Sequence, residues 1–404
     1  MGEYKTILAG FGKMDVTPFA NVHLGSFNNG MERLSTSIKE NDPFNALALA
    51  LTDEDGETMI FIVTDLSWGH IKWARRIREI LLERYGIPGD HVVLGGTHNH
   101  SGPDWYSEAS ETLANRTYLE HWLNGVLGAV YIAMMDRKPA RIQIGRTKTV
   151  GMNFVRRYWR EDGNLFGGGP ARFYVQSDSP IVRHESEPDE EVQMVRFVRE
   201  EGKDILIGQW QNHGCHIGGT KLCATDWIGP HRRKVERELG CHYFYMQGCA
   251  GNIQTGSRIK EEWPKKLNED QIGYAVADSV VAAYRKSGTF TDVNAGKIKT
   301  IQQVFHGVSV DDDPWEGEMN TISVGDISVV TFPVEMFDTS GKELKAATPY
   351  AMTLLMGYSC GIHGYCPDKT AFSHGGYECT SRGVSGTAEK IVQTHLEALE
   401  KLHS

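Results

Sequence analysis

Apolar residues follow two different periods in the first part of the chain. Residues 45–51 alternate small and large side chains, and residues 58–63 form a compact apolar run with β-branched members, which is typical of core strands. The acidic turn at 53–56 separates these segments and indicates a hairpin. Apolar residues then recur at helical spacing over about 68–85, and Gly86 ends this predicted helix.

The alternation of strands and helices continues to the end of the chain. Further strands are predicted at residues 91–94, 204–210, 242–246, 297–304, 321–324, 327–332 and 352–357. Further helices are predicted over about 117–135, from about Pro230, and over about 269–286 and 387–402. We find no internal repeat, low-complexity block or linker. We therefore expect one domain over residues 1–404, of the α/β class, with mixed β-sheets flanked by helices.

Composition and charge narrow the classes to which this protein can belong. The 404 residues include 42 Lys and Arg against 52 Asp and Glu, a formal net charge of −10. This net charge argues against nucleic-acid binding, because phosphate binding depends on a positive face. No segment reaches the roughly 20 apolar residues of a membrane span, and the start lacks the layout of a secretory signal. Seven cysteines without a C-x-x-C pair favour reduced thiols, so we expect a cytoplasmic protein without membrane insertion.

The sharpest local motif is Gly-Gly-Thr-His-Asn-His-Ser-Gly-Pro at residues 95–103, directly after a predicted strand. In a glycine-rich loop, His98 and His100 can both point into one cavity, with one imidazole on a metal ion and the other moving protons. The metallo-β-lactamase pattern is excluded because Gly102 and Pro103 occupy its last two ligand positions. An amidohydrolase barrel is disfavoured because at least two predicted strands precede the motif.

Other polar residues follow the ends of later predicted strands. The segment Asn-His-Gly-Cys-His offers His216 as a ligand, with His213 and Cys215 as rivals. Glu335 ends another strand, and Tyr365 lies in a later loop. Because α/β proteins commonly place their sites at strand ends, these residues could converge at one end of a sheet. The chain has no Walker loop and no G-x-G-x-x-G, G-x-S-x-G or H-E-x-x-H motif, which removes the commonest alternative enzymes.

In their order along the chain, these motifs resemble the catalytic domain of the neutral (neutral/alkaline, non-lysosomal) ceramidases and their shorter bacterial relatives. Thr-His-Asn-His-Ser-Gly-Pro is similar to the family's T-H-T-H-S-G-P. The other matches are Met-Asp-Val-Thr-Pro at 14–18, Asn-Phe-Val-Arg at 153–156, Asn-His-Gly-Cys-His at 212–216, Gln-Gly-Cys-Ala-Gly-Asn-Ile at 247–253, Pro-Val-Glu at 333–335, and Tyr365 and Tyr377. The resemblance covers essentially the whole chain and implies a ceramidase-like catalytic domain with a metal site at strand ends.

The resemblance implies a zinc ion (Zn2+) held by His98, His216, Glu335 and Tyr365. Two neutral imidazoles, a carboxylate and a phenol are suitable zinc donors, and they leave room for water or a substrate oxygen. Bound zinc can lower the pKa of its water to about 7, which yields hydroxide at neutral pH.

The resemblance also implies roles for residues around the metal. His100 is expected to take the proton of the attacking water and return it to the leaving nitrogen. Tyr377 is expected to donate a hydrogen bond to the tetrahedral oxyanion. Arg156 is expected to orient a polar or anionic part of the substrate, with the neighbouring Arg157 as the alternative.

Two substitutions separate this chain from the ceramidases themselves. Gln254 stands where the family has a serine that contacts the substrate, and Asn252 replaces an aspartate. An amide with donors and acceptors takes the place of a hydroxyl, and we expect Gln254 to bind substrate. We also expect the protein to lack the family's C-terminal domain and secretion signal. We therefore do not expect ceramide as the substrate, and a small, polar, soluble molecule fits better.

We predict a zinc-dependent hydrolase that cleaves an amide bond, or alternatively an ester, of such a molecule with metal-activated water. Two alternatives stay open: a metal-dependent lyase or isomerase acting on a sugar-like metabolite, and a zinc-binding protein without catalysis. Retention of His100 and Tyr377, which zinc-dependent folding alone does not require, weighs against the second alternative. The oligomeric state, the physiological metal and the identity of the substrate stay open.

Overall fold

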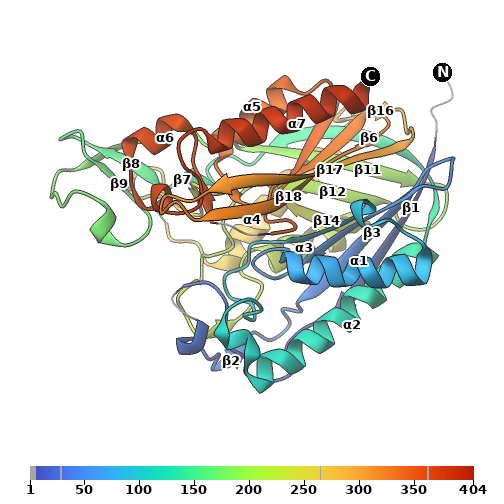
Figure 1. The fold of residues 1–404 in the computed structure, drawn as a ribbon, viewed down its shortest axis with the longest axis horizontal. Coiled ribbons are helices and arrows are strands. Elements are labelled where there is room, and N and C mark those ends of the chain that lie inside the picture. The colour runs from blue at the N-terminus through green and yellow to red at the C-terminus, as the bar shows by residue number, and fades with distance from the viewer. Residues whose placement is uncertain (1–5, 28–29, 264, 362–363) are drawn as a thin grey trace.

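The computed structural model describes residues 6–27, 30–263, 265–361 and 364–404. Two layers of β-strands lie between two layers of helices (Figure 1). The helices α1 and α2 cover one side of the strands, and α5 and α7 cover the other. The protein therefore has the predicted α/β class, with mixed sheets flanked by helices.

The helices agree with the apolar periodicity of the sequence. Those in the described residues are α1 (Ile71–Tyr85), α2 (Leu113–Met135), α3 (Ile228–Leu239), α4 (Glu269–Arg285), α5 (Asp338–Ala347), α6 (Lys369–His374) and α7 (Thr387–His403). The helix α1 ends, as predicted, at Gly86, whose φ of +68° favours glycine. None of these helices combines the length and the apolar run that a membrane span requires.

The larger sheet has nine strands, ordered β14-β12-β11-β6-β1-β3-β4-β5, with β16 paired to β6. Their bounds are β1 (Ile7–Asp15), β3 (Asn45–Thr52), β4 (Thr58–Thr64), β5 (Val92–Gly96), β6 (Lys138–Lys148), β11 (Glu191–Arg199), β12 (Ile205–Trp210), β14 (His242–Gln247) and β16 (Phe290–Val293). The predicted hairpin at 53–56 joins β3 to β4. Phe11 of β1 stacks on His242 of β14 with ring centroids 4.6 Å apart, so the twisted sheet folds back on itself.

The smaller sheet has four strands in the order β17-β18-β19-β21. Their bounds are β17 (Ile298–Val308), β18 (Pro314–Val324), β19 (Ile327–Thr331) and β21 (Met352–Met356). Successive residues of each strand point to opposite faces. Val329 and Leu354 share a core with the larger sheet, whereas Val330 and Leu355 pack with residues of α5 and α7. Both faces of the smaller sheet are therefore covered.

The alternation of small and large residues in β3 has a packing reason. The glycines and alanines of β1 and β3 pair in register, with Gly10 opposite Ala50 and Gly12 opposite Ala48. A Cβ atom on Gly12 would lie 1.8 Å from the carbonyl oxygen of Ala129 in α2. The small face of these strands therefore lets α2 approach the backbone closely, while the leucines of β3 point the other way.

Parallel crossovers place the functional loops. The strand β4 pairs with β5 through α1, β12 pairs with β14 through α3, and β19 pairs with β21 through α5. Short strand pairs join the loops that leave these strands: β20 (Glu335–Met336) with β22 (Tyr365–Cys366), β7 (Phe154–Val155) with β15 (Ile253–Gln254), and β2 (Ser37–Ile38) with β13 (Leu222–Cys223). The strands β8 (Arg157–Arg160), β9 (Leu165–Gly167) and β10 (Ile181–His184) form a projecting lobe.

Candidate metal centre

His98 lies in the loop after β5, with its side chain buried. Its φ of +61° is in the left-handed region that non-glycine residues rarely adopt. The Nδ1 atom of His98 lies 3.1 Å from the carbonyl oxygen of Ser67 and can donate a hydrogen bond to it. With the proton on Nδ1, the lone pair of this ring lies on Nε2, which is the form of histidine that binds a metal.

His213 lies in the loop after β12 and is also buried. Two backbone contacts hold this loop against the one that follows β5. Asn99 and Gly214 form an isolated β-bridge, and the amide of His100 donates to the carbonyl oxygen of Gly214 at 2.8 Å. The two histidine-bearing loops are therefore joined through their backbones.

Glu335 begins β20, and its partner in β22 is Tyr365. The Oε2 atom of Glu335 lies 3.4 Å from Nε2 of His98 and 3.5 Å from Nε2 of His213. This oxygen is buried and has no hydrogen-bond partner among the described residues. Ligands at about 2.0–2.1 Å from a tetrahedral zinc ion lie about 3.3–3.4 Å apart. The oxygen thus lies at ligand spacing from both imidazole nitrogens.

Electrostatics in the cluster favour an anion beside neutral imidazoles. Burial alone would raise the pKa of Glu335, but His98 and His213 outweigh this effect and hold that pKa well below its ordinary value. Burial lowers the pKa of His213 to about 3, assisted by Arg156 and His98. At neutral pH, Glu335 is ionised and His213 is neutral, and these are the states that coordinate a cation.

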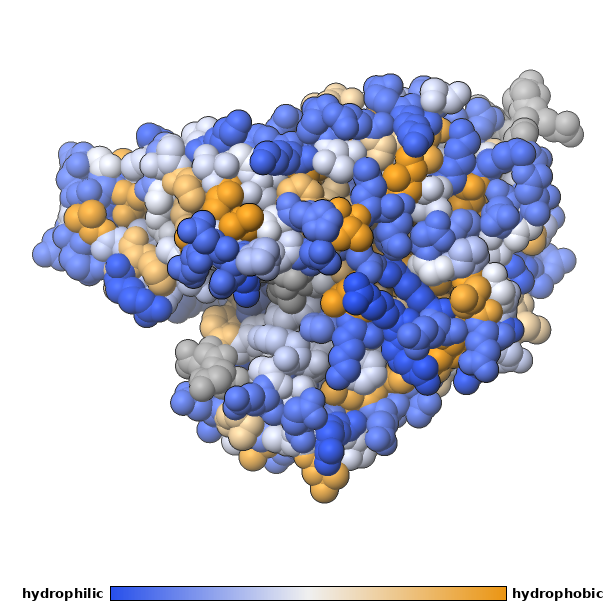
Figure 2. Space-filling model, in the orientation of Figure 1, coloured by the Kyte–Doolittle hydropathy of each residue, from blue (hydrophilic) through white to orange (hydrophobic). Residues whose placement is uncertain are grey.

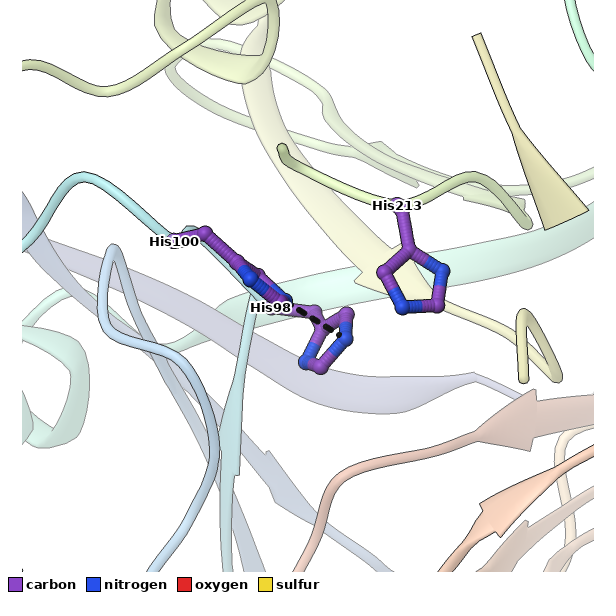
Figure 3. A group of neighbouring side chains, drawn as sticks. All are labelled: His98, His100 and His213. Atoms are coloured by element: carbon purple, nitrogen blue, oxygen red, sulfur yellow. Dashed lines mark hydrogen bonds between the residues drawn. The ribbon is translucent and has the colours of Figure 1, made fainter. Parts of the chain in front are cut away.

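His100 completes a group of three imidazoles with His98 and His213 (Figure 3). Each offers one ring nitrogen, and these nitrogens lie within 4.8 Å of one another. Nε2 of His100 lies 3.0 Å from Nε2 of His98. Burial, assisted by the other two imidazoles, lowers the pKa of His100 well below its ordinary value. The group could therefore hold a metal ion, and His100 is its partly exposed member.

Arg156, rather than Arg157, faces the imidazoles. Its Nη1 lies 3.4 Å from Nε2 of His213, and its Nε donates to Glu378 at 2.9 Å. Its Nη2 is buried without a hydrogen-bond partner in the described residues. Arg157 instead donates to both oxygens of Glu185 and to Glu378. The second arginine is therefore engaged by carboxylates, whereas the first keeps a free donor.

Tyr365 and Tyr377 lie beside Arg156. Their ring centroids are 5.4 Å apart, and Cζ of Arg156 lies 5.2 Å from the ring centroid of Tyr365. Burial raises the pKa of Tyr365 well above its ordinary value, although Arg156 opposes the effect. Burial and Glu335 also raise the pKa of Tyr377. Both phenols are therefore protonated at neutral pH in the metal-free chain.

The expected metal ligand His216 is not part of this cluster. Its Nδ1 lies 3.2 Å from the hydroxyl of Thr255. His213, the rival candidate in the same segment, takes the place expected of His216 and lies beside Glu335. The physical reason is the bridge at Gly214, which holds the loop so that the earlier histidine reaches the centre.

Gln254 and Asn252, the two residues that differ from the ceramidase motif, lie in different surroundings. Gln254 lies in β15, which pairs with the strand that leads to Arg156. Its amide donates to the carbonyl oxygen of Gly256 at 3.3 Å, and none of its hydrogen bonds in the described residues reaches the imidazoles. The side-chain nitrogen of Asn252 donates to Asp338 at 2.7 Å. An aspartate at this position would face a buried carboxylate, which accounts for the amide.

Two neighbours of the centre escaped the sequence analysis. The ring of Tyr358 stacks on His98, with centroids 3.7 Å apart. The buried carboxylate of Glu378 joins Arg156 to the next arginine. The sequence held a weak indication of Glu378. Two adjacent arginines need a negative partner if they are buried, and Glu378 directly follows Tyr377. We find no comparable signal for Tyr358.

The layers and the cluster at their loop ends define a ceramidase-like fold. No protein-family model matches the sequence. The chain is similar to the crystal structure of neutral ceramidase from Pseudomonas aeruginosa, with a TM-score of 0.79 and 15% identity over 99% of this chain and 75% of that one. It is also similar to a ceramidase complexed with C2, with a TM-score of 0.78 and 14% identity over the same shares. These likenesses establish the fold.

Proposed function

We propose that the protein is a zinc-dependent hydrolase that cleaves an amide bond, or alternatively an ester, of a small polar substrate. One observation carries the proposal: the buried Oε2 of Glu335 has no partner in the described residues and lies 3.4 and 3.5 Å from Nε2 of His98 and His213. A buried carboxylate oxygen without a donor is costly unless a ligand satisfies it. The ceramidase-like fold supports the proposal, because it suggests a hydrolase.

The proposed zinc ligands are His98, His213, Glu335 and Tyr365. Imidazole nitrogens and a carboxylate oxygen are common zinc donors, and catalytic sites keep a further position for water or substrate. The hydrogen bond from Nδ1 of His98 to Ser67 supports coordination through Nε2. The pairing of Tyr365 with Glu335 across β20 and β22 supports its inclusion.

His100 is proposed as the acid and base of the reaction. When bound, a zinc ion would supply Lewis acidity that polarises the substrate carbonyl and lowers the pKa of water. His100 takes the proton of the attacking water and then gives it to the leaving nitrogen. The lowered pKa keeps this imidazole neutral, and therefore able to accept a proton, at neutral pH.

Two further side chains are proposed to bind the substrate as it reacts. Tyr377 keeps its phenolic proton and donates a hydrogen bond to the oxyanion that forms from the carbonyl oxygen. The free Nη2 of Arg156 binds a polar or anionic group on the acyl part. A buried guanidinium with an unused donor favours such a substrate over a two-tailed lipid such as ceramide. Gln254, which is partly exposed beside the strand that leads to Arg156, is proposed as a rim contact.

The proposal is tested by metal analysis combined with product analysis. The purified protein is stripped with a chelator, reloaded with zinc, and incubated with a panel of N-substituted succinamic acids, whose carboxylate lies on the acyl part, in water labelled with oxygen-18. A hydrolase incorporates one labelled oxygen into the carboxylate product, and only when the metal is present. His100→Ala is the matched variant, because it should keep the metal and lose turnover.

Each other result contradicts part of the proposal. Turnover without solvent oxygen in the product would indicate lyase or isomerase chemistry. Stoichiometric zinc without turnover in either protein would indicate a binding protein without catalysis. Absence of bound zinc after reloading would contradict the metal centre itself.

A further inference from the structure

Phe27 lies beside His100 at the solvent-facing side of the centre. Its side chain is 42% exposed. The ring meets His100 edge to face, with centroids 5.1 Å apart and an interplanar angle of 63°. The mechanism proposed above gives no role to this apolar surface next to its acid and base.

A buried arginine holds this ring in place. The segment 24–27, which we call the strap, has left-handed backbone at both Ser26 and Phe27, with φ of +58° and +51°. Nη1 of Arg33 donates to the carbonyl oxygens of Gly25 and Ser26 at 2.6 and 2.7 Å. It also donates to the carbonyl oxygen of His100 at 3.1 Å. One guanidinium therefore fixes the strap to the histidine loop, and the strained backbone is held by a specific anchor.

The molecule also leaves room for the ring. A Cβ atom on Gly218 would lie 2.3 Å from Cε2 of Phe27, so only glycine fits at this position without a shift. The surface is hollowed between the lobe that carries β8 and β9 and the lower part that carries β2 (Figure 2). The close approach of Gly218 and the exposed fraction of the side chain show that Phe27 is packed on one side by the chain and open to solvent on the other.

Arg156 and Phe27 lie toward different members of the imidazole group. Arg156 contacts His213 and Tyr365, whereas Phe27 contacts His100. Under the proposed function, on which this step rests, His100 protonates the leaving nitrogen. The group beside His100 is therefore the amine part of the substrate, and the group beside Arg156 is the acyl part.

We propose that Phe27 is a specificity residue that packs against an apolar or aromatic amine group of the substrate. The substrate class is then an amide with a polar or anionic acyl end and an apolar amine end. Apolar contact with an exposed ring strengthens binding of the apolar amine and leaves small amines unaffected.

The test uses two amides that share one acyl group, N-benzylsuccinamic acid and N-methylsuccinamic acid. Their binding to the metal-free chain of 404 residues is measured by titration calorimetry, which requires no turnover. The wild type should bind the benzyl compound about tenfold more tightly. Phe27→Ala should reduce this preference to within about twofold, and Phe27→Leu should retain part of it. Phe19→Ala, which removes an exposed phenylalanine that packs on His121, is the matched control and should retain the full preference.

The outcomes separate this inference from the proposed function. Equal binding of the two amides by the wild type, or an unchanged preference in Phe27→Ala, would overturn the role of Phe27. So would failure of both amides to bind. Metal-loaded wild type that cleaves neither amide, while the preference depends on Phe27, would contradict the proposed function and leave the aromatic contact supported.

Discussion

Two buried carboxylates close to the loop at 97–103 have opposite surroundings. The carboxylate of Asp65 accepts hydrogen bonds from both terminal nitrogens of Arg232, at 2.9 and 2.5 Å, and from the backbone amide of Asn45. The Oε2 atom of Glu335 receives no hydrogen bond in the described residues and faces imidazole nitrogens. Both side chains are shielded from solvent. The comparison teaches that a buried carboxylate with hydrogen-bond donors on both oxygens serves the fold, whereas a buried carboxylate oxygen that faces imidazole nitrogens without a donor suits a bound cation.

The largest effect on metal content and activity should come from removing an imidazole beside Glu335. His213→Ala takes away a proposed ligand, so the bound zinc should fall well below one per chain and turnover should fall by roughly a thousandfold or more. His216→Ala is the matched control in the same segment and should retain metal and most activity. Metal analysis and kcat/KM measurements check both variants. Metal loss in His216→Ala alone would restore the ligand predicted from the sequence.

The pair of Asp65 and Arg232 should instead contribute to the stability of the fold. Arg232→Met leaves the Asp65 carboxylate buried and unpaired, and this should lower the free energy of unfolding by about 3–5 kcal/mol. Glu335→Gln removes a charge that only the neutral imidazoles face, so it should lower the metal-free unfolding free energy by less than Arg232→Met does. Urea titrations of the two metal-free variants provide the measurement. Equal destabilisation by both would remove the distinction between the two carboxylates.

His395 extends the comparison to the dependence of stability on pH, because both of its ring nitrogens have hydrogen-bond partners. His395 is fully buried, with its ring nitrogens 2.8 Å from the Thr321 hydroxyl and 3.0 Å from the Thr331 carbonyl oxygen. Burial lowers its pKa from 6.5 to about 4. The unfolded chain therefore takes up the proton first, and stability that is present above pH 6.5 is lost as the pH falls towards 4.

The expected loss from His395 is about 2–3 kcal/mol between pH 7 and pH 4.5. His395→Gln should reduce this acid sensitivity by a similar amount while lowering stability at pH 7. Urea titrations of wild type and variant at the two pH values give the difference. An identical pH dependence in both proteins would show that His395 does not titrate in this way.

The smallest effect should separate the two adjacent arginines. Arg156→Lys keeps the charge but loses the planar fork beside Tyr365, and should raise KM about tenfold with a small change in unfolding free energy. Arg157→Lys breaks a two-pronged contact with Glu185, and should mainly lower thermal stability. Parallel KM and melting measurements check the pair. The reverse pattern would assign the substrate contact to Arg157.

The fold was predictable from the sequence where apolar periodicity was strong. The helices α1 and α2 and the hairpin at 53–56 follow directly from that pattern. The strands β6 and β11 were not assigned, because each mixes charged and apolar residues at its partly exposed positions. Their place in the larger sheet depends on pairing with each other over nine residues, a long-range contact that no local pattern contains.

Only those residues of the centre that belong to recognisable sequence motifs could be predicted. His98, Glu335 and Tyr365 were selected through a family resemblance, and the structure brings His98 and Glu335 together. The choice between His213 and His216 was beyond the sequence, because an irregular loop has no fixed side-chain period. The bridge between Asn99 and Gly214 accompanies the placement of His213 beside Glu335, and that bridge joins segments more than a hundred residues apart.

The two halves of the centre have different attachments. The imidazole loops extend from the larger sheet and are tied to each other at Gly214, whereas Glu335 and Tyr365 form their own pair beyond the smaller sheet. A cation bound by all four side chains would therefore act as a cross-link across the seam between the sheets. Binding of a metal ion would then make the contact between the two sheets more rigid, in addition to supplying catalytic chemistry.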